Sequence, residues 1–170
     1  YSNTSGDMNT ASGNRALFSN TTGTRNTAAG LKSLHSNETG SHNAANGYRA
    51  LLANTTGSFN TAIGTDALDS NATGSHNIAL GYKAGDATTG SDNILIGNEG
   101  VAAESSTIRI GTPGTHTTAF LSGDVDVEGD VTFGVENTSL TSALVSAVGG
   151  VAEINQDCAV NTGCFAGDSA

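Results

Sequence analysis

The sequence predicts an all-β chain that folds as a parallel β-solenoid, or β-roll, of about six coils with 17 residues in each. The first observation behind this prediction is a five-residue block that opens with Asn and closes on Gly. The block recurs at Asn9, Asn26, Asn43, Asn60, Asn77 and Asn93. The second observation is a further Gly that follows each of the first five blocks. The third is that only four- or five-residue extended stretches fit between the glycines, which is too short for helices. Stacked in register, such coils lie about 4.8 Å apart and place identical residues in ladders.

The glycines mark the expected turns of each coil. One set closes the blocks, at Gly13, Gly30, Gly47, Gly64, Gly81 and Gly97, and the other ends the following turn, at Gly23, Gly40, Gly57, Gly74 and Gly90. Because Gly has no Cβ, two glycines per repeat indicate two places where the backbone turns tightly or where two backbones approach closely.

Side-chain alternation within each block predicts how a coil buries its apolar atoms. The third position is Ala in five blocks and Leu95 in the last, and it points to one face while the second and fourth positions point to the other. That second face becomes steadily more apolar, from Thr10 and Ser12 to Ile94 and Ile96. Since a strand that is apolar on both faces needs cover on both, we expect a homotrimer of solenoids side by side. The expected trimer-packing residues are Ile63, Ile78, Leu80, Ile94 and Ile96.

The chain divides into three expected regions. They are the repeat solenoid at residues 1–100, a β-rich transition segment at residues 101–133 and a C-terminal region at residues 134–170. The solenoid opens in mid-repeat, because Tyr1–Gly6 aligns with Phe18–Gly23, and we therefore expect a piece of a longer fibre. The repeat is expected to stop after Gly100.

Two strands are expected in the transition segment, Ser106–Ile110 and Thr117–Leu121, around a Pro-Gly turn typical of type II. Acids then alternate with valines over Asp124–Phe133, which predicts a half-buried strand with an acidic outer face. A calcium site is the alternative for these carboxylates, but their spacing of two lacks the EF-hand arrangement.

The C-terminal region contains a stretch, residues 140–154, that fits either a short helix or a buried strand pair. Cys158 and Cys164 are the only cysteines, and such a pair predicts a disulfide formed in an oxidising compartment, either within one chain or between subunits. A metal site is the weaker interpretation, because no His or further Cys stands nearby to complete a tetrahedral ligand set.

Composition and charge argue against several classes of function. The formal net charge is −10, and an acidic surface repels nucleic acid and anionic lipid, so neither is an expected partner. No stretch approaches the roughly 18–20 consecutive apolar residues of a membrane span, and no signal peptide heads the sequence. Motifs of nucleophilic, metal-dependent and phosphate-binding enzymes are absent, so we expect no catalytic residue, no cofactor and no metal.

Three periodic patterns have both a functional and a simpler interpretation. Asn20, Asn37, Asn54 and Asn71 head Asn-x-Thr sequons, as Asn3 heads an Asn-x-Ser sequon, but Asn and Thr are also common in turns. A row of bases, Arg15, Lys32, Arg49 and Lys83, would suit an anionic glycan, but Asp66 interrupts it and a solvated face is the simpler interpretation. His42 and His76 share one phase with Arg25 and Phe59, which predicts an exposed variable position and no ligand site.

The segments Asn77–Gly85 and Asn93–Gly97 resemble the head repeats of trimeric autotransporter adhesins. The Asn-Thr-Ala-x-Gly repeats of residues 9–76 resemble those of large bacterial surface and tail-fibre-like proteins, and Ser106–Gly123 is similar to the segment that follows such repeats. The resemblance implies a left-handed parallel β-roll assembled as a homotrimer.

The expected function is therefore a non-enzymatic structural or adhesive component of a bacterial extracellular fibre or surface filament. The expected partners are further copies of the chain, as a homotrimer whose rods stack end to end, and a surface glycan or host-surface ligand. Two alternatives remain open at this point: a solenoid that binds glycan or ice, and a fragment of a tail-spike-like hydrolase directed at capsular polysaccharide.

Overall fold

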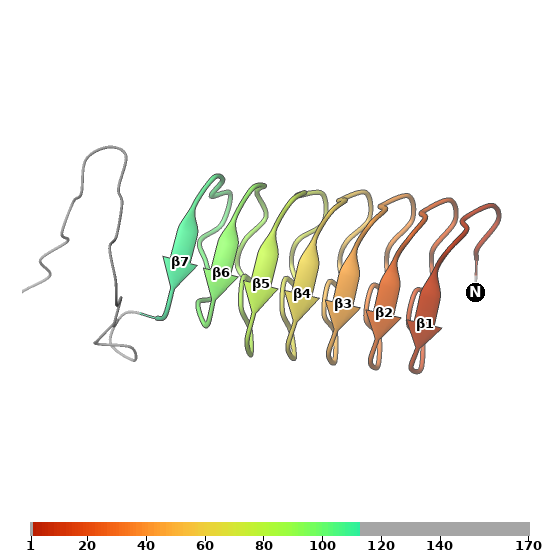
Figure 1. Cartoon of the computed structure of the whole chain (residues 1–170), viewed down its shortest axis with the longest axis horizontal. Coiled ribbons are helices and arrows are strands. Elements are labelled where there is room, and N and C mark those ends of the chain that lie inside the picture. Colours follow the sequence, from red (N-terminus) through yellow and green to blue (C-terminus); the bar gives the residue numbers. More distant parts are fainter. Residues whose placement is uncertain (1, 113–170) are drawn as a thin grey trace, which may run out of the picture. The chain divides into compact units, whose positions relative to one another are not determined.

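The chain forms an all-β solenoid in which seven short parallel strands make a single sheet (Figure 1). The computed structural model describes residues 2–112, and the predictions for Thr117–Leu121, Asp124–Phe133, residues 134–170 and the cysteine pair lie outside this range. The strands are β1 (Thr10–Ser12), β2 (Thr27–Ala29), β3 (Ala44–Asn46), β4 (Thr61–Ile63), β5 (Ile78–Leu80), β6 (Ile94–Ile96) and β7 (Ile108–Ile110). The predicted all-β parallel solenoid is thus confirmed for residues 2–112. Residues 2–112 contain no helix that is long and apolar enough to cross a membrane.

Each strand pairs only with the strands of the coils before and after it, in the order β1 to β7. The register follows the repeat, so that Ala28 lies opposite Ala45, and Ala62 opposite Ala79. A Gly directly follows each of the strands β1 to β6, and from Gly13 to Gly81 these glycines have φ between 122° and 149°. Residues other than glycine rarely adopt this backbone conformation, and the strand ends after three residues where the glycine turns the chain.

Corners of the coil also use left-handed backbone at residues with side chains. In one coil Lys32 has φ 59°, Leu34 has φ 48° and His42 has φ 60°, and the equivalent residues of neighbouring coils repeat these values closely. Each such residue costs about 1–2 kcal/mol relative to a right-handed conformation. The sequence placed the turns at glycines alone and missed these three corners.

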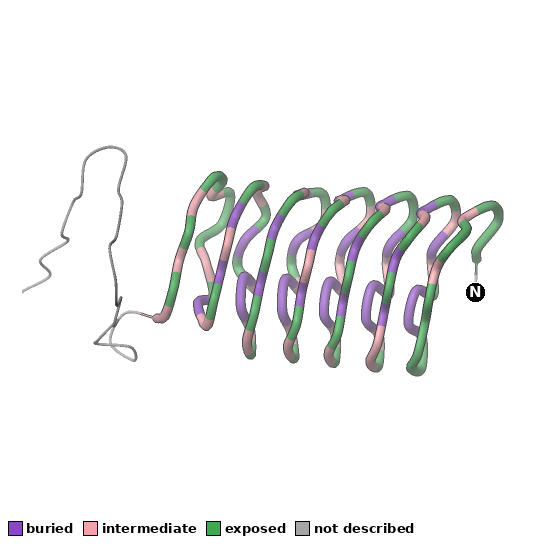
Figure 2. Tube along the Cα trace, in the orientation of Figure 1, coloured by how far each residue is buried: buried purple, intermediate pink, exposed green. Residues whose placement is uncertain are grey.

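Small side chains fill the inside of the coil. The third position of the blocks is buried at Ala28, Ala45, Ala62, Ala79 and Leu95, which confirms the predicted inward face. A second buried column, Leu17, Leu34, Leu51 and Leu68, comes from the opposite side of the coil. Figure 2 shows buried and exposed residues alternating along the strands. The solenoid is therefore filled within one chain, without the outer face of the sheet.

Two columns of buried asparagines run through the same interior. In the first, the opening Asn of each block ties three segments together: Asn43 Nδ2 donates to the Gly57 carbonyl at 2.8 Å, and Asn43 Oδ1 accepts the Asn60 N–H at 2.9 Å. In the second, Asn37 Nδ2 donates to Asn20 Oδ1 at 2.7 Å and to the Gly40 carbonyl at 2.9 Å. Buried polar groups are costly unless they are hydrogen-bonded, and these amides bond to one another and to the turns. Asn54 Oδ1 is an exception, because it is buried and accepts no hydrogen bond within the described residues.

The strand ladder continues past Gly100, where we expected the repeat to stop. β7 pairs with β6 in register at a spacing of fourteen residues, although Thr107 replaces the usual Asn. The inward position opposite Leu95 holds Arg109, whose Nε donates to Glu104 Oε2 at 2.7 Å. An ion pair thus replaces the apolar contact of the other coils.

Glu104 has a well-supported carboxylate. Its Oε1 accepts the Val101 N–H at 2.8 Å and the Thr88 hydroxyl at 3.3 Å, and its side chain is 9% exposed. Burial opposes the charged form, but the hydrogen bonds from Arg109 and Val101 outweigh it and hold the pKa of Glu104 below its usual value.

The first testable prediction concerns the close approach of neighbouring turns. A Cβ at Gly47 would lie 2.3 Å from the Gly64 carbonyl oxygen, whereas a Cβ at Gly81 would have no atom nearer than 3.5 Å, although φ is positive at both. Gly47→Ala should therefore destabilise the chain by at least about 3 kcal/mol, and Gly81→Ala only by the backbone strain of about 1–3 kcal/mol. Denaturant unfolding measures both, and equal losses would contradict the steric argument.

The second prediction is a pH-dependent contribution of Glu104 to the pairing of β7. A carboxyl group whose pKa is lower in the folded chain than in the unfolded chain stabilises the fold at pH values above the ordinary Glu pKa of about 4.3. This stabilisation is lost as the pH falls through the pKa of the folded chain. Glu104→Gln should weaken β7 by about 1–2 kcal/mol at pH 7, and the difference from wild type should shrink below pH 4. Hydrogen exchange of the Gly111 amide, which bonds to the Ile96 carbonyl, measures this effect. Glu99→Gln, at an exposed site, is the control.

Candidate interaction surface

The outer face of the sheet is the main exposed apolar surface of the described chain. Ile63, Ile78 and Leu80 are 45–46% exposed and Ile96 is 37% exposed, while Ile94 is partly exposed. All five residues that the sequence assigned to trimer packing thus lie on one face of β4, β5 and β6, turned away from the filled interior.

β7 extends this surface by two residues that the sequence analysis missed. Ile108 and Ile110 are 68% exposed and lie in register with Ile94 and Ile96. The signal was present as the Ile-x-Ile pattern, but the absence of an opening Asn hid it. We call the seven residues the apolar strip: Ile63, Ile78, Leu80, Ile94, Ile96, Ile108 and Ile110.

The same face is polar at the other end of the sheet. Thr10 and Ser12 on β1 are exposed, as is Asn46 on β3, so the apolar strip begins only at β4. Contiguous apolar patches on soluble proteins commonly mark interaction sites. The face is therefore divided between a polar half at β1–β3 and an apolar half at β4–β7.

Ion pairs divide the row of bases into two parts. Arg49 contacts Asp69 and lies 3.5 Å from Asp66, while Lys83 lies 3.8 Å from Asp86. Burial raises the pKa of Asp69, and the Arg49 guanidinium offsets this only in part. These two bases are thus paired, which agrees with a solvated, charge-balanced face.

The N-terminal part of the row lies beside aromatic rings. Arg15 Cζ lies 6.0 Å from the centre of the Phe18 ring, which stacks on His35 at 5.4 Å. Burial lowers the pKa of His35, and the charges of Lys32 and Arg15 lower it further. The positive potential of the row therefore lies in its first two coils.

His42 and His76 belong to an ordered column on another side of the coil. Both rings stack on Phe59, with centroids 4.7 Å and 5.1 Å away, and Arg25 and Asp92 contact the outer ends of the column. The predicted exposure of this position is confirmed, since Arg25, His42, Phe59 and His76 are all exposed, but the stacking of the rings was not predicted. Because the ring faces contact one another, they are not presented as a platform for a sugar.

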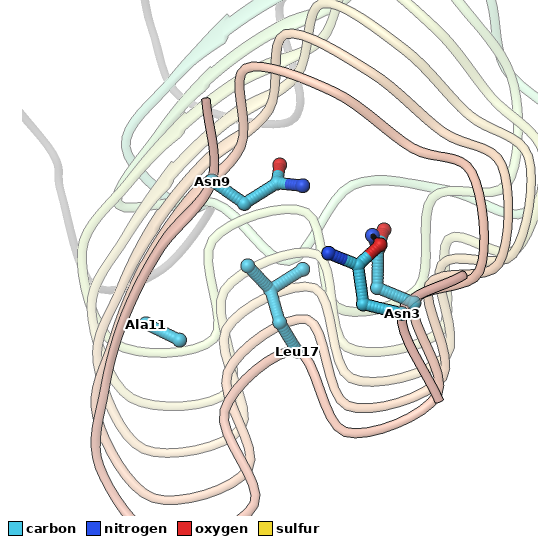
Figure 3. A pocket seen from close by; sticks show the side chains of 5 residues that line it. Asn3, Asn9, Ala11 and Leu17 are labelled. Carbon is cyan, nitrogen blue, oxygen red and sulfur yellow. Dashed lines mark hydrogen bonds between the residues drawn. The ribbon is translucent and has the colours of Figure 1, made fainter. Parts of the chain in front are cut away.

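One hollow of about 260 Å³ lies at the end of the first coil, lined by Asn3, Asn9, Ala11, Leu17 and Asn20. Figure 3 shows these amide and Leu side chains converging on the interior of the solenoid. The lining of the hollow offers amides and apolar groups, with no nucleophile or titratable side chain.

No metal site is evident in the part of the chain that the structure describes, because no three His, Asp or Glu side chains converge there. The alternative calcium site at Asp124–Asp130 and the cysteine pair lie beyond this part. Within residues 2–112, the surface that stands out is thus the apolar strip. No family model, no curated protein and no solved structure matches the chain.

Proposed function

We propose that the chain is a non-enzymatic structural rod of a bacterial extracellular fibre, in which three copies associate along the apolar strip. The observation that carries this proposal is the exposure of large aliphatic side chains on an otherwise complete solenoid. The interior is filled by the chain itself, so the strip is not needed to close the coil. Its burial is available for association, at about 25 cal/mol for each Å² removed from water.

In the proposed trimer, the apolar strip of each chain is covered by the apolar strips of the other two chains. Closed cyclic association lets each copy contribute the same surface, and three rods side by side enclose their strips around one axis. The resemblance to trimeric adhesin heads supports this number of chains. An adhesive role toward a surface glycan or host ligand, at the bacterial cell surface, belongs to the same proposal.

The alternative of ice binding is less well supported, because threonine hydroxyls in the turns donate to backbone carbonyls of the next coil. Thr21 Oγ1 donates to the Glu38 carbonyl at 2.9 Å and Thr55 Oγ1 to the Ala72 carbonyl at 3.0 Å. On the regular outer face of the sheet, Thr gives way to Ile at Ile78 and Ile94. A hydrolytic role finds no support in the hollow of the first coil, because no nucleophile or titratable side chain lines it.

The third prediction tests the trimer. Wild type should sediment as a species of three chains, and Leu80→Asp should yield a folded single chain. Leu80 is exposed in the isolated coil, whereas a charge buried without a partner in an interface costs several kcal/mol. Thr56→Asp, an equal change of charge at an exposed turn residue, should leave the trimer intact.

Two outcomes would contradict the trimer. Wild type that sediments as a stable monomer at micromolar concentration would exclude the trimer itself, and Leu80→Asp that remains trimeric would exclude the apolar strip as its interface. Circular dichroism of each variant separates loss of association from loss of the fold, because the filled interior does not depend on Leu80.

End-to-end stacking of trimers is the further part of this proposal. The fourth prediction is that electron micrographs of the full chain show filaments and that deletion of residues 151–170 yields discrete short rods. Filaments that persist after this deletion would exclude the C-terminal residues as the joint.

A further inference from the structure

The second column of buried asparagines coincides with four N-glycosylation sequons. Asn20, Asn37, Asn54 and Asn71 each head an Asn-x-Thr sequence. We infer that attachment of an N-glycan at any of these four residues and closure of the solenoid are mutually exclusive. Each sequon can therefore be modified only in the unfolded chain, and its modification prevents that coil from forming.

Burial of the reacting amides is the first observation behind this inference. Asn20 is 2% exposed and Asn37, Asn54 and Asn71 are 0% exposed. The surroundings have no spare room, because even a methyl group on Gly57 would lie 2.4 Å from Asn54 Oδ1. A sugar on Nδ2 is far larger than a methyl group and would have to occupy the interior between two coils.

Hydrogen bonding of the same amides is the second observation. Asn37 Nδ2 donates to Asn20 Oδ1 at 2.7 Å and to Gly40 O at 2.9 Å, and Asn54 Nδ2 donates to Asn37 Oδ1 at 2.7 Å and to Gly57 O at 3.0 Å. Both amide hydrogens are thus used. Asn71 Nδ2 donates to the Gly74 carbonyl at 3.0 Å, and its Oδ1 accepts the Gly74 N–H at 3.0 Å.

The chemistry of glycan transfer removes one of these hydrogens. The donor is a lipid-linked oligosaccharide diphosphate: the Nδ2–C1 bond forms, the C1–O bond to the diphosphate breaks, the lipid diphosphate leaves and one amide proton is lost to a base. The product amide has a single N–H. It cannot make both donor bonds of Asn37 or Asn54, and a buried acceptor left without its donor costs about 1–3 kcal/mol.

The fold exposes the threonine of each sequon but buries the asparagine that would be modified. The third residues of the four sequons, Thr22, Thr39, Thr56 and Thr73, are all exposed, whereas the asparagines are buried. The asparagine is therefore reachable only before its coil closes. A compartment that transfers oligosaccharide to unfolded chains would hold this chain unfolded, so the fold requires synthesis or export without such transfer.

The exposed threonines also provide a clean test. The variant Thr22→Ala/Thr39→Ala/Thr56→Ala/Thr73→Ala removes all four sequons while it keeps every ladder asparagine. Wild type and this variant are produced in a bacterial cytoplasm without oligosaccharyl transfer and, behind a secretion signal, in yeast. Glycopeptide mass spectrometry then reads occupancy separately in the protease-resistant and protease-sensitive fractions. Gly47→Val, which blocks coil closure, serves as the unfolded reference in yeast.

We expect both chains to fold alike in the bacterium. In yeast, glycans at the four asparagines should be confined to the protease-sensitive fraction and to Gly47→Val, and the quadruple variant should recover a several-fold larger resistant fraction. If wild type folds before transfer, the four sites should be empty in it and occupied in Gly47→Val, which also supports the inference. Resistant wild type that carries a glycan at any of the four sites would overturn it, and so would empty sites in Gly47→Val.

Discussion

The structure depends on one interaction, the hydrogen bonding of buried asparagine amides between successive coils. Each such amide, as at Asn37, donates to a turn carbonyl of its own coil and to the amide oxygen of the preceding coil. This pair of bonds holds the coils at the spacing of a parallel sheet. At that spacing neighbouring turns touch, and only glycine fits where a Cβ would lie 2.3 Å from a carbonyl oxygen, as at Gly40 and Gly57. The asparagines and glycines of the repeat are therefore two parts of the same constraint.

This constraint explains why strained corners are retained in every coil. A strand of three residues is too short to turn back on itself without left-handed backbone, and Lys32, Leu34 and His42 adopt it although they have side chains. The cost of each corner is offset because the same corner brings an inward Leu and a buried Asn to the lumen. The coil that has one residue fewer between Asn77 and Gly90 differs at one glycine: Gly81 lacks the close contact of its equivalents, whereas Gly74 still lies close to the Gly90 carbonyl.

Period and side-chain alternation were enough to predict the strands, their register and the inward column of alanines, because these depend on contacts between equivalent residues. The rest depends on contacts between unlike residues. β7 is stabilised by Glu104 and Arg109, whose ion pair replaces the inward apolar contact of the other coils. The column of His42, Phe59 and His76 forms by stacking of different ring types, so identity between repeats did not reveal it. The buried asparagines were assigned to turns because turn and ladder both favour Asn, and only their burial separates the two.

The division between a uniform interior and a variable exterior bears on function. Amides and small apolar side chains of a single chain fill the interior of the solenoid. The residues on the outer face of the sheet are therefore not required for the coil to fold. That face changes from Thr10 and Ser12 to Ile108 and Ile110 while the backbone ladder stays the same. Because folding of the coil does not require this change from polar to apolar residues, we attribute it to contact with another molecule. Because the apolar half is confined to β4–β7, association through this face would cover those strands and leave the interior of each coil unchanged.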